Sequence, residues 1–342
     1  MDKPLISIII AVYNAENYFK ECMNSVLHQT YTRLDIVLVD DGSTDTSGRL
    51  CDEYASGDSR IQVIHKKNGG LMSAWIAGVK QAKGEYFSFV DSDDWIELRM
   101  MEELSKHLSG NPKEMVCSNY IIEKRNASVP MLQSMKPGCY NRREIEEQLF
   151  PCLLGKEVRR IHSSRCMKLI SRKLILDNLN YCNPALTMGE DMNIILPALL
   201  DTHRLVVVPE GLYYHYRFVD ASMVHRYNPQ LYEKIHLLYL TLKKVLEAKS
   251  TDGQLLEELK KEYIFLLFLV MKNELRGPKE EYRERIRELI EEAKEEEGLG
   301  RVKVKIKGKA NLLLYYIWKK PTDFRIRAGW LAMQIFDGRV KE

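Results

Sequence analysis

The residues best suited to metal chemistry form the run Asp91-Ser92-Asp93-Asp94, which directly follows an apolar stretch. Mg²⁺ and Mn²⁺ prefer oxygen ligands and are usually held by one or two carboxylates together with substrate phosphates. Carboxylates crowded at one point repel each other unless a cation neutralises them. The alternative is a solvated acidic turn that caps the next helix, and the run alone favours neither interpretation.

A second polar cluster, Asp40-Asp41-Gly42-Ser43-Thr44-Asp45, also follows an apolar stretch. One of its carboxylates could accept a hydrogen bond from a base imide or a ribose hydroxyl. The simpler interpretation is a turn with a helix N-cap, and different residues could fill the two roles. Tyr13, at the end of the first apolar stretch, offers a ring for stacking on a base, or else is an ordinary core tyrosine.

These clusters need a scaffold that brings strand ends together, and the first hundred residues alternate between strand and helix patterns. Apolar runs at residues 6–12, 34–40, 61–65 and 86–90 predict strands, separated by helices ending near residues 29, 54 and 82. This alternation predicts a doubly wound, mainly parallel α/β sheet with helices on both faces. Ligands bind beyond the carboxyl ends of such strands, where every polar cluster named above lies.

The remainder of the chain is less regular. We expect a strand near residues 115–122, a loop at 126–141, helices near 142–154, 171–178 and 189–200, and a short strand at 205–208. Helical patterns follow at 231–248, 254–275 and 279–297. We therefore expect a catalytic domain at 1–225, with a nucleotide-binding half at 1–105 and an acceptor half at 106–225. A helical C-terminal region then covers 226–342.

The order and spacing of the motifs resemble the family 2 glycosyltransferases of the GT-A fold, of the inverting bacterial type. The matching stretches are Ser7-Ile8-Ile9-Ile10-Ala11-Val12-Tyr13-Asn14, Val39-Asp40-Asp41-Gly42-Ser43-Thr44-Asp45, Asn68-Gly69-Gly70, Gly84-Glu85-Tyr86 and Val90-Asp91-Ser92-Asp93-Asp94. The match is close over about the first hundred residues. Beyond them, Gly189-Glu190-Asp191 and Tyr213-Tyr214-His215-Tyr216-Arg217 look like later landmarks of the family.

The resemblance implies a role for each matching position. Ala11, Tyr13 and Asp41, with Asp40 beside them, match positions that hold the uracil of a UDP donor, and Asn68 matches a position near the nucleotide. Asp91, Ser92 and Asp93 match the DxD motif, with Asp93 as the more direct ligand of Mn²⁺ or Mg²⁺ and Asp91 as its companion. Asp191 matches the general base that takes a proton from the acceptor hydroxyl.

Two of these assignments have plain structural alternatives. Acidic residues favour the first turn of a helix, so Asp191 could be there for the helix dipole alone. His215 and Arg217 could reach the metal or the diphosphate from a loop, with His215 as a metal ligand; a histidine among aromatic residues is more often simply packed.

One position departs from the family pattern. Many members carry Arg-Asn where this chain has Trp75-Ile76, and that arginine would face the donor diphosphate. Lys66, Lys67 or Arg217 could replace it, or Trp75 could pack on the sugar.

The composition of the chain bears on its cellular location and on possible contact with a membrane. The net charge is only +3, yet residues 299–342 hold eleven Lys or Arg against three Asp or Glu, interleaved with aromatic residues. Such a tail suits an anionic membrane surface, or else a helical subdomain with a solvated basic face. No stretch is long and apolar enough for a membrane span. Seven scattered cysteines without a CxxC pair favour a reducing compartment. We expect a cytoplasmic protein, with peripheral contact to the inner face of the membrane left open.

The sequence thus favours an enzyme that moves a sugar from a UDP-sugar to a hydroxyl of a glycan or lipid-linked acceptor in surface polysaccharide synthesis. No nucleic-acid motif accompanies the basic residues, and a homo-oligomer is left open. A sugar-1-phosphate nucleotidyltransferase would need a glycine-rich basic loop where Asn14-Ala15-Glu16-Asn17 stands. A non-catalytic nucleotide-sugar binding protein is the other alternative, which Trp75 keeps open.

Overall fold

The computed structural model describes residues 3–218, 227–249, 253–278 and 281–340. The chain divides into two compact units, Met1–Leu149 with Arg160–Val219, and Phe150–Arg159 with Asp220–Glu342. The domain boundary expected at residues 225 and 226 falls within 219–226, outside the described residues. The sequence pattern gave no sign that the ten residues from Phe150 to Arg159 group with the second unit.

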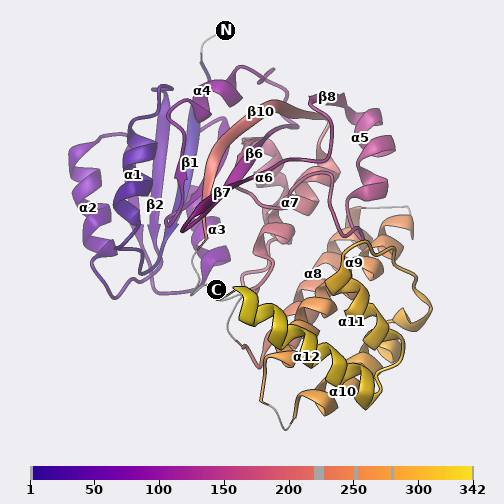
Figure 1. The fold of residues 1–342 in the computed structure, drawn as a ribbon. Coiled ribbons are helices and arrows are strands. Elements are labelled where there is room, and N and C mark those ends of the chain that lie inside the picture. Colours follow the sequence, from indigo (N-terminus) through magenta and orange to yellow (C-terminus); the bar gives the residue numbers. More distant parts are fainter. Residues whose placement is uncertain (1–2, 219–226, 250–252, 279–280, 341–342) are drawn as a thin grey trace. The chain divides into compact units, whose positions relative to one another are not determined.

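The first unit is built on a mixed, mostly parallel sheet (Figure 1). Its strands are β1 (Ile6–Val12), β2 (Leu34–Asp40), β3 (Ile61–His65), β4 (Tyr86–Asp91), β5 (Trp95–Ile96), β6 (Glu114–Lys124), β7 (Ala127–Met131), β8 (Gly138–Asn141), β9 (Lys168–Ser171) and β10 (Arg204–Arg217). The order across the sheet is β3-β2-β1-β4-β9-β6-β10-β5, with β7 beside β6 and β8 beside β10. Strands β3, β2, β1 and β4 are parallel, as are β6 and β10, whereas β9 runs antiparallel between β4 and β6.

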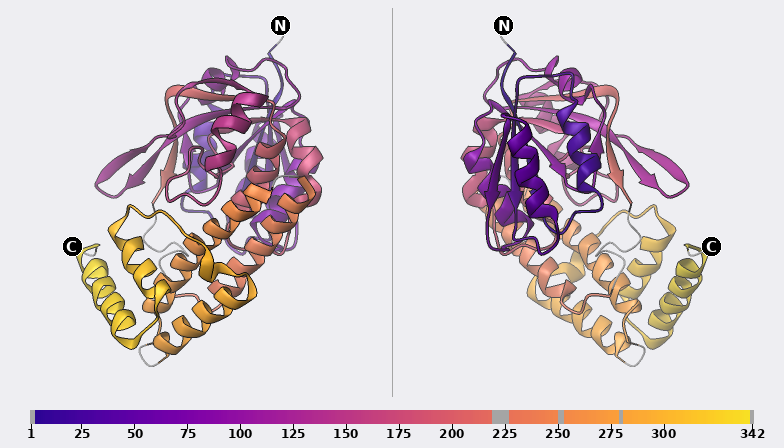
Figure 2. Two further views of the ribbon diagram at one scale, coloured as in Figure 1. Left: turned by 90° about the vertical axis from the view of Figure 1, so that its right-hand side faces the viewer. Right: turned by 90° about the vertical axis from the view of Figure 1, so that its left-hand side faces the viewer.

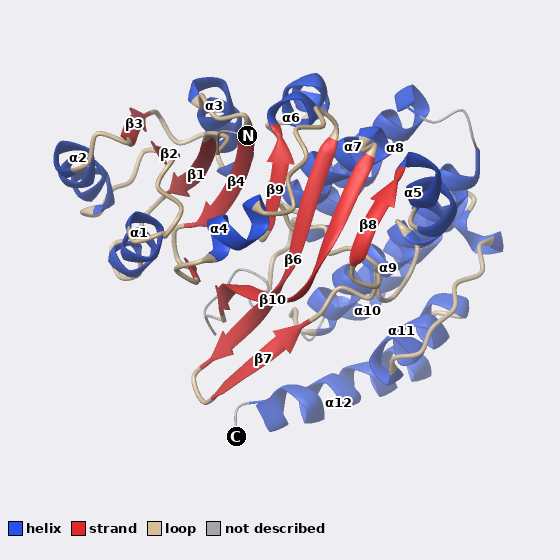
Figure 3. Cartoon of the chain, turned by 90° about the horizontal axis from the view of Figure 1, so that it is seen from above, coloured by secondary structure: helices blue, strands red, loops and turns tan. Residues whose placement is uncertain are grey.

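Helices cover both faces of this sheet, with α1 and α4 on one face and α3, α6 and α7 on the other (Figure 3). The helices are α1 (Phe19–Leu27), α2 (Ser47–Gly57), α3 (Leu71–Gln81), α4 (Met100–Ser105), α5 (Arg142–Gln148), α6 (Arg172–Asn178) and α7 (Glu190–Asp201). Every residue of β1 and β2 is buried, which is why these strands read as unbroken apolar runs. The expected doubly wound α/β architecture is confirmed in this unit.

The strand register aligns the ends that carry the polar motifs. Ala11 lies opposite Asp91 across the β1–β4 pair, and Val12 lies opposite Asp40 across the β1–β2 pair. Asp40 in turn lies opposite His65 on β3. Because these strands are parallel, their carboxyl ends form one edge, and the loops that follow them meet there.

The segment expected to be a loop, residues 126–141, was predicted wrongly. It forms β7, which pairs antiparallel with β6, and β8, which pairs with β10. Figure 2 shows β6 and β7 as a two-stranded arm. Pro130 and Gly138 led to the prediction of a loop, because proline and glycine are uncommon inside strands and are typical of turns. Proline is tolerated on an edge strand, since its missing N–H then faces away from the ladder.

The second unit is helical, as expected. Its elements are η1 (Phe150–Cys152), α8 (Leu231–Lys249), α9 (Gly253–Leu275), α10 (Tyr282–Glu296), η3 (Leu299–Arg301), α11 (Lys309–Lys319) and α12 (Asp323–Val340). Helix α9 is central, because it packs against η1 and against each of the other four helices. Buried Tyr263 of α9 stacks on Tyr239 of α8 with ring centroids 4.1 Å apart. Within the described residues, no helix is long and apolar enough to cross a bilayer.

The aromatic residues of the basic tail fall into two groups. Trp318 is buried, Tyr315 packs edge-on against Phe268, and Trp330 stacks on Tyr282. In contrast, Tyr316 is 51% exposed and Phe324 is 78% exposed. The side chain of Phe336, the last aromatic residue of this group, is outside the described residues. Some aromatic residues of the tail therefore pack within the second unit, and others are exposed to solvent.

Candidate active site

The loops after β1, β2 and β3 are bonded to one another at the shared strand edge. Asn14 adopts a positive φ of 49°, and its side-chain oxygen accepts a hydrogen bond from the Thr44 N–H at 2.8 Å. The backbone of Gly42 has a φ of +75°, and a Cβ there would lie 2.8 Å from the Asn68 nitrogen. Only glycine fits this close approach. Exposed Tyr13 and Asn68 are thus presented by loops that hold each other in place.

The two carboxylates at the carboxyl end of β2, Asp40 and Asp41, are buried and already bonded. The Asp40 carboxylate accepts from the Ser43 N–H and from the Nδ1 of His65, both at 2.9 Å. Burial would raise the pKa of Asp40, but the hydrogen bonds from Ser43 and His65 outweigh it and leave that pKa lowered.

Asp41 fixes the loop that carries Asn68. Its carboxylate accepts from the Gly69 N–H at 3.0 Å and the Gly70 N–H at 2.8 Å, and it pairs with Lys66. Its side chain is only 4% exposed. Both Asp40 and Asp41 therefore shape this strand edge through the loops they bind.

The carboxylates after β4 crowd together. Burial, followed by the negative charge of Asp91, raises the pKa of Asp93. Burial also raises the pKa of Asp91, by more than the adjacent Arg165 lowers it. Asp94 has its pKa raised by burial and by the charges of Asp91 and Asp93, and its carboxylate accepts from the Tyr214 hydroxyl at 2.7 Å and the Arg217 N–H at 2.8 Å. The arrangement favours a cation at this point.

The carboxylate ligands available here fit a hard divalent cation that is bound together with a substrate diphosphate. Within the described part of the chain, no three His, Cys, Asp or Glu side chains form a metal cluster, and no other side chain bonds to the Asp93 carboxylate. Mg²⁺ is commonly held by only one or two carboxylates, with the rest of its shell from phosphates and water. Asp93, with Asp91 beside it, is the pair that would hold such an ion.

A buried arginine joins the first carboxylate of this motif to Asp191. Asp191 lies in the first turn of α7, after Gly189 in a left-handed conformation. Its Oδ1 accepts from a guanidinium nitrogen of Arg165 at 2.7 Å, and a second guanidinium nitrogen pairs with Asp91. The Arg165 side chain is 2% exposed, so these ion pairs lie in a poorly solvated environment.

Trp75 is the platform for this arginine. The guanidinium carbon of Arg165 lies 3.4 Å from the centroid of the Trp75 ring, a close cation–π stack. Trp75 is itself buried and contacts Phe89 edge-on. The ring is therefore occupied by Arg165, and the sugar-packing role that the sequence left open for Trp75 finds no exposed face.

Arg165 is held by its own loop. The buried Lys168 amino group donates to the His162 carbonyl at 2.9 Å and to the Ser164 carbonyl, and burial lowers the pKa of Lys168.

Sequence reasoning missed Arg165, because a single arginine in Ser163-Ser164-Arg165-Cys166 has no diagnostic spacing. Only the folded chain shows that it stacks on the very residue that replaces the family arginine.

His215 is not part of the carboxylate cluster. Its Nδ1 bonds to Glu123 and its Nε2 to Glu97, each at 2.8 Å, and its ring stacks on Trp95. Its strand neighbours Tyr214 and Tyr216 line the cavity beside Asp91, so the side chain between them points to the opposite face. With both ring nitrogens engaged, this geometry does not favour His215 as a metal ligand.

Arg217 lies closer to the motif. It donates from Nε to the Asp93 carbonyl at 2.9 Å, pairs with Glu21, and stacks on Tyr18 and Trp95. These contacts hold the backbone of the Asp93 turn.

A cavity of about 180 Å³ opens over the cluster. It is lined by Asp91, Asp94, Tyr120, Ile122, Ser164, Cys166, Met167, Asp191, Tyr214 and Tyr216. Within the described residues, the Asp191 carboxylate forms no hydrogen bond other than that to Arg165. One carboxylate oxygen can therefore face a small hydroxyl compound in this cavity.

Comparisons with known proteins identify the family of the chain. The family model described as "Glycosyl transferase family 2" matches residues 7–174. The uncharacterized glycosyltransferase EpsJ of Bacillus subtilis is 31% identical over 244 residues, which cover 69% of this chain and 68% of EpsJ. The putative glycosyltransferase EpsH of the same organism is 32% identical over 264 residues, covering 77% of this chain and 74% of EpsH.

Among solved structures, S. aureus TarS 1–349 in complex with UDP-GlcNAc has a TM-score of 0.68 to this chain at 19% sequence identity. The match covers 98% of this chain and 92% of that one. A mannosyltransferase from Pyrobaculum calidifontis, solved with GDP-Man and Mn²⁺, has a TM-score of 0.53 at 15% identity, with 99% and 88% covered. At these identities the likeness concerns the fold, which is that of GT-A transferases.

Proposed function

Because the chain belongs to glycosyltransferase family 2, and is therefore a glycosyltransferase, we propose that it transfers a sugar from a UDP-sugar to an acceptor hydroxyl with inversion. The observation that carries this proposal is that Asp191 and Asp91 line one cavity and are bridged by the buried Arg165. A sugar-1-phosphate nucleotidyltransferase and a non-catalytic binding protein, which the sequence left open, have no support from the relatives named above.

The donor's nucleotide would bind at the edge formed by the loops after β1, β2 and β3. Exposed Tyr13 offers its ring to the uracil, beside the backbone of Ala11, and Asn68 lies on the neighbouring loop. Buried Asp40 and Asp41 stabilise the loops of this edge through the hydrogen bonds and the ion pair described above. That TarS has been solved with UDP-GlcNAc supports a UDP-sugar as the donor class.

The metal, Mn²⁺ or Mg²⁺, would be held by Asp93 and Asp91, next to Ser92, and would neutralise charge on the diphosphate. The neighbour solved with Mn²⁺ supports this cofactor class. The guanidinium of Arg165 pairs with Asp91 and Asp191, so it would act on the donor site through these two carboxylates and not as a direct ligand of the diphosphate. It reaches the site from the loop before β9 and uses Trp75 as its platform.

The chemistry then needs one base. Asp191 accepts the proton of the acceptor hydroxyl as its oxygen attacks the anomeric carbon. The new glycosidic bond forms as the bond from the anomeric carbon to the diphosphate oxygen breaks on the opposite face, and UDP leaves. Arg165 holds Oδ1 of Asp191, which fixes the direction of the carboxylate and leaves its other oxygen for the hydroxyl.

We further propose a glycan or lipid-linked acceptor in surface polysaccharide synthesis. The exposed aromatic rings of Tyr316 and Phe324 amid basic residues support peripheral contact with an anionic membrane, where a lipid-linked acceptor would be found. A cytoplasmic location with such contact, and a homo-oligomeric state, stay predictions.

The base assignment is tested by Asp191→Asn. We expect transfer to fall by roughly 10²–10⁴-fold, the usual contribution of a positioned base, while UDP affinity measured by calorimetry stays within about twofold. The adjacent Glu190→Gln is the matched control, and we expect it to retain most of the activity. Full transfer by Asp191→Asn, or loss confined to Glu190→Gln, would contradict the assignment.

A further inference from the structure

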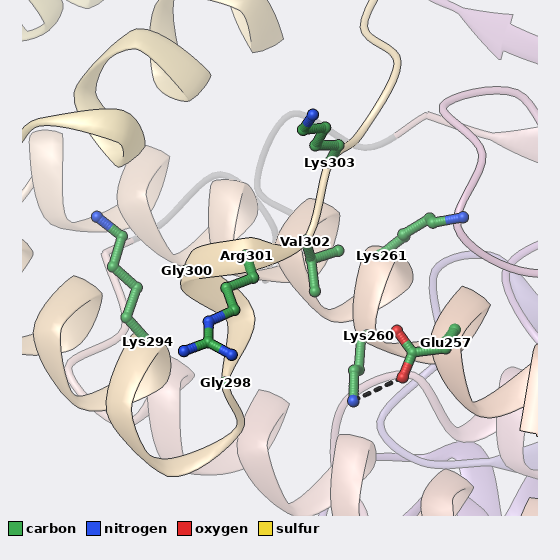
Figure 4. Close-up of a pocket in the computed structure, with 9 residues that line it drawn as sticks. All are labelled: Glu257, Lys260, Lys261, Lys294, Gly298, Gly300, Arg301, Val302 and Lys303. Atoms are coloured by element: carbon green, nitrogen blue, oxygen red, sulfur yellow. Dashed lines mark hydrogen bonds and ion pairs between the residues drawn. The ribbon is translucent and has the colours of Figure 1, made fainter.

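The second unit contains a cavity of its own, with a volume of about 820 Å³. Its walls come from α9, from α10 and from the segment that runs from Gly298 to Lys303 (Figure 4). Every residue that lines it belongs to the second unit. Nothing in the proposed transfer reaction uses this cavity.

The charge of the cavity is strongly positive. Lys260, Lys261, Lys294, Arg301 and Lys303 line it, against Glu257 as the one carboxylate. Glu257 is paired with Lys260 at 2.7 Å (Figure 4), and Lys261 pairs with Glu258.

Three cations of the wall form no ion pair with a carboxylate of the described residues: Lys294, Arg301 and Lys303. Lys294 is attracted by Glu291 of its own helix without an ion pair between them. Lys294 lies over the ring of buried Trp318 at 5.3 Å from its centroid. Burial, followed by repulsion from Lys319, lowers the pKa of Lys294. A cation in such surroundings gains from a nearby negative charge.

The segment that carries Arg301 and Lys303 is fixed at both ends. At its start, Leu299 is fully buried in the helical core. At its end, the Lys307 N–H donates to the Glu157 carboxylate at 2.7 Å, and the Gly308 N–H donates to the same group at 3.1 Å.

Between these anchors the side chains alternate. Val302, Val304 and Ile306 are half-buried, whereas Arg301, Lys303, Lys305 and Lys307 are exposed. The segment therefore presents its cations to solvent from a backbone that is anchored at both ends, and the two nearest its start, Arg301 and Lys303, line the cavity. An anchored segment loses less backbone entropy on binding an anion than a free one.

We propose that this cavity binds a phosphate-bearing group with two or more negative charges. Glu257, the one carboxylate of the wall, is paired with Lys260, so the charges of the other three cations are not neutralised within the wall. A guanidinium and ammonium groups on one cavity wall are suited to phosphate oxygens. The group could belong to a soluble phosphorylated glycan or to the headgroup of an anionic lipid. The site is independent of the proposed transfer mechanism.

Arg301→Glu/Lys303→Glu in the full chain tests the proposal, with Lys320→Glu as a control on an exposed residue of the same unit outside the cavity wall. Both changes fall on exposed side chains, so folding is expected to be unaffected. Binding is measured by calorimetry with sodium tripolyphosphate in EDTA, and by sedimentation with vesicles containing phosphatidylglycerol. UDP affinity is measured in the wild type, the double variant and Lys320→Glu. This measurement separates a defect in the proposed donor site from a loss of anion binding in the second unit.

We expect the double variant to lose at least about tenfold in tripolyphosphate affinity, because two phosphate contacts are reversed in sign, while Lys320→Glu stays within about twofold. If only vesicle binding is lost, the proposal holds with a lipid headgroup as the source. Equal binding of both probes by all three proteins would overturn it. So would an equal loss in Lys320→Glu, since that indicates attraction to general surface charge.

Discussion

Arg165 makes contacts at the candidate site that no lysine could reproduce. Its fork bonds Asp91 and Asp191 with different nitrogens while its flat face stacks on Trp75. A lysine at this position could place one point charge between the carboxylates but could not stack its head group as a plane. We regard Arg165 as a positioning residue, because it bonds both the proposed base, Asp191, and Asp91 of the proposed metal site.

Arg165→Lys should therefore lower kcat by at least about tenfold, since small losses of alignment are costly in group transfer. The KM for the donor should change much less, which separates misalignment from loss of binding. Arg172→Lys is the control: Arg172 bonds the Ala82 and Gly84 carbonyls, so its replacement should lower the Tm without lowering kcat in folded enzyme. A wild-type kcat in Arg165→Lys would show that the fork is not needed.

His65 makes the stability of the folded chain sensitive to pH. Hydrogen bonds to Asp40 and Asp52 raise the pKa of His65. A raised folded-state pKa means that protonation stabilises the folded chain. This stability is fully present below the unfolded pKa of about 6.5 and is lost as pH rises through the folded value.

Thermal melts at about pH 6 and about pH 8 should show a lower Tm at the higher pH, with a smaller difference in His65→Gln. The effect should be modest, because the His65 side chain is 48% exposed and solvent screens its charge. An identical pH dependence in the variant would exclude this histidine as the cause.

Among the elements, helix α3 has to approach the sheet very closely to place Trp75. Gly78 makes this possible, because a Cβ at this position would lie 2.5 Å from the Ile9 Cγ2 and 3.2 Å from the Val39 Cγ2. Both are buried strand residues.

Gly78→Ala should destabilise the fold by about 1–3 kcal/mol, the usual cost of an overpacked core, despite the better helix propensity of alanine. Gly57→Ala in α2 is the control, since nothing lies within 4 Å of its Cβ position, and it should be neutral or stabilising by up to about 1 kcal/mol. Urea unfolding of the two variants measures both values. A neutral Gly78→Ala would mean that α3 can shift without cost.

The elements differ in how well the sequence predicted them, for physical reasons. Strands β1 and β2 are buried on both faces, so their apolar runs had no competing interpretation. Strand β9 has only four residues, and it includes Lys168, whose amino group finds backbone carbonyls when buried. No local pattern predicts a buried lysine in a strand, because its partners come from the tertiary fold.

At the scale of the whole molecule, the sequence predicted the motifs but not the contacts between them. The resemblance pointed to Asp91 and Asp191 separately, a hundred residues apart in the chain. Their connection through Arg165 depends on the stacking of this residue, from the loop before β9, on Trp75 of α3, and only the folded chain brings these two residues together. The sequence predicted that the second unit is helical. It did not predict that residues 150–159 belong to this unit, or that the unit contains a basic cavity, because both depend on tertiary packing.

The central claim is that this family 2 glycosyltransferase uses a UDP-sugar with Asp191 as the base, and UDP release over a panel of nucleotide-sugars tests it most directly. We predict that the wild type releases UDP from at least one UDP-sugar in the presence of Mn²⁺, that EDTA abolishes release, and that Asp191→Asn releases none above background. Turnover confined to GDP- or dTDP-sugars, or equal UDP release by the wild type and Asp191→Asn, would contradict the account.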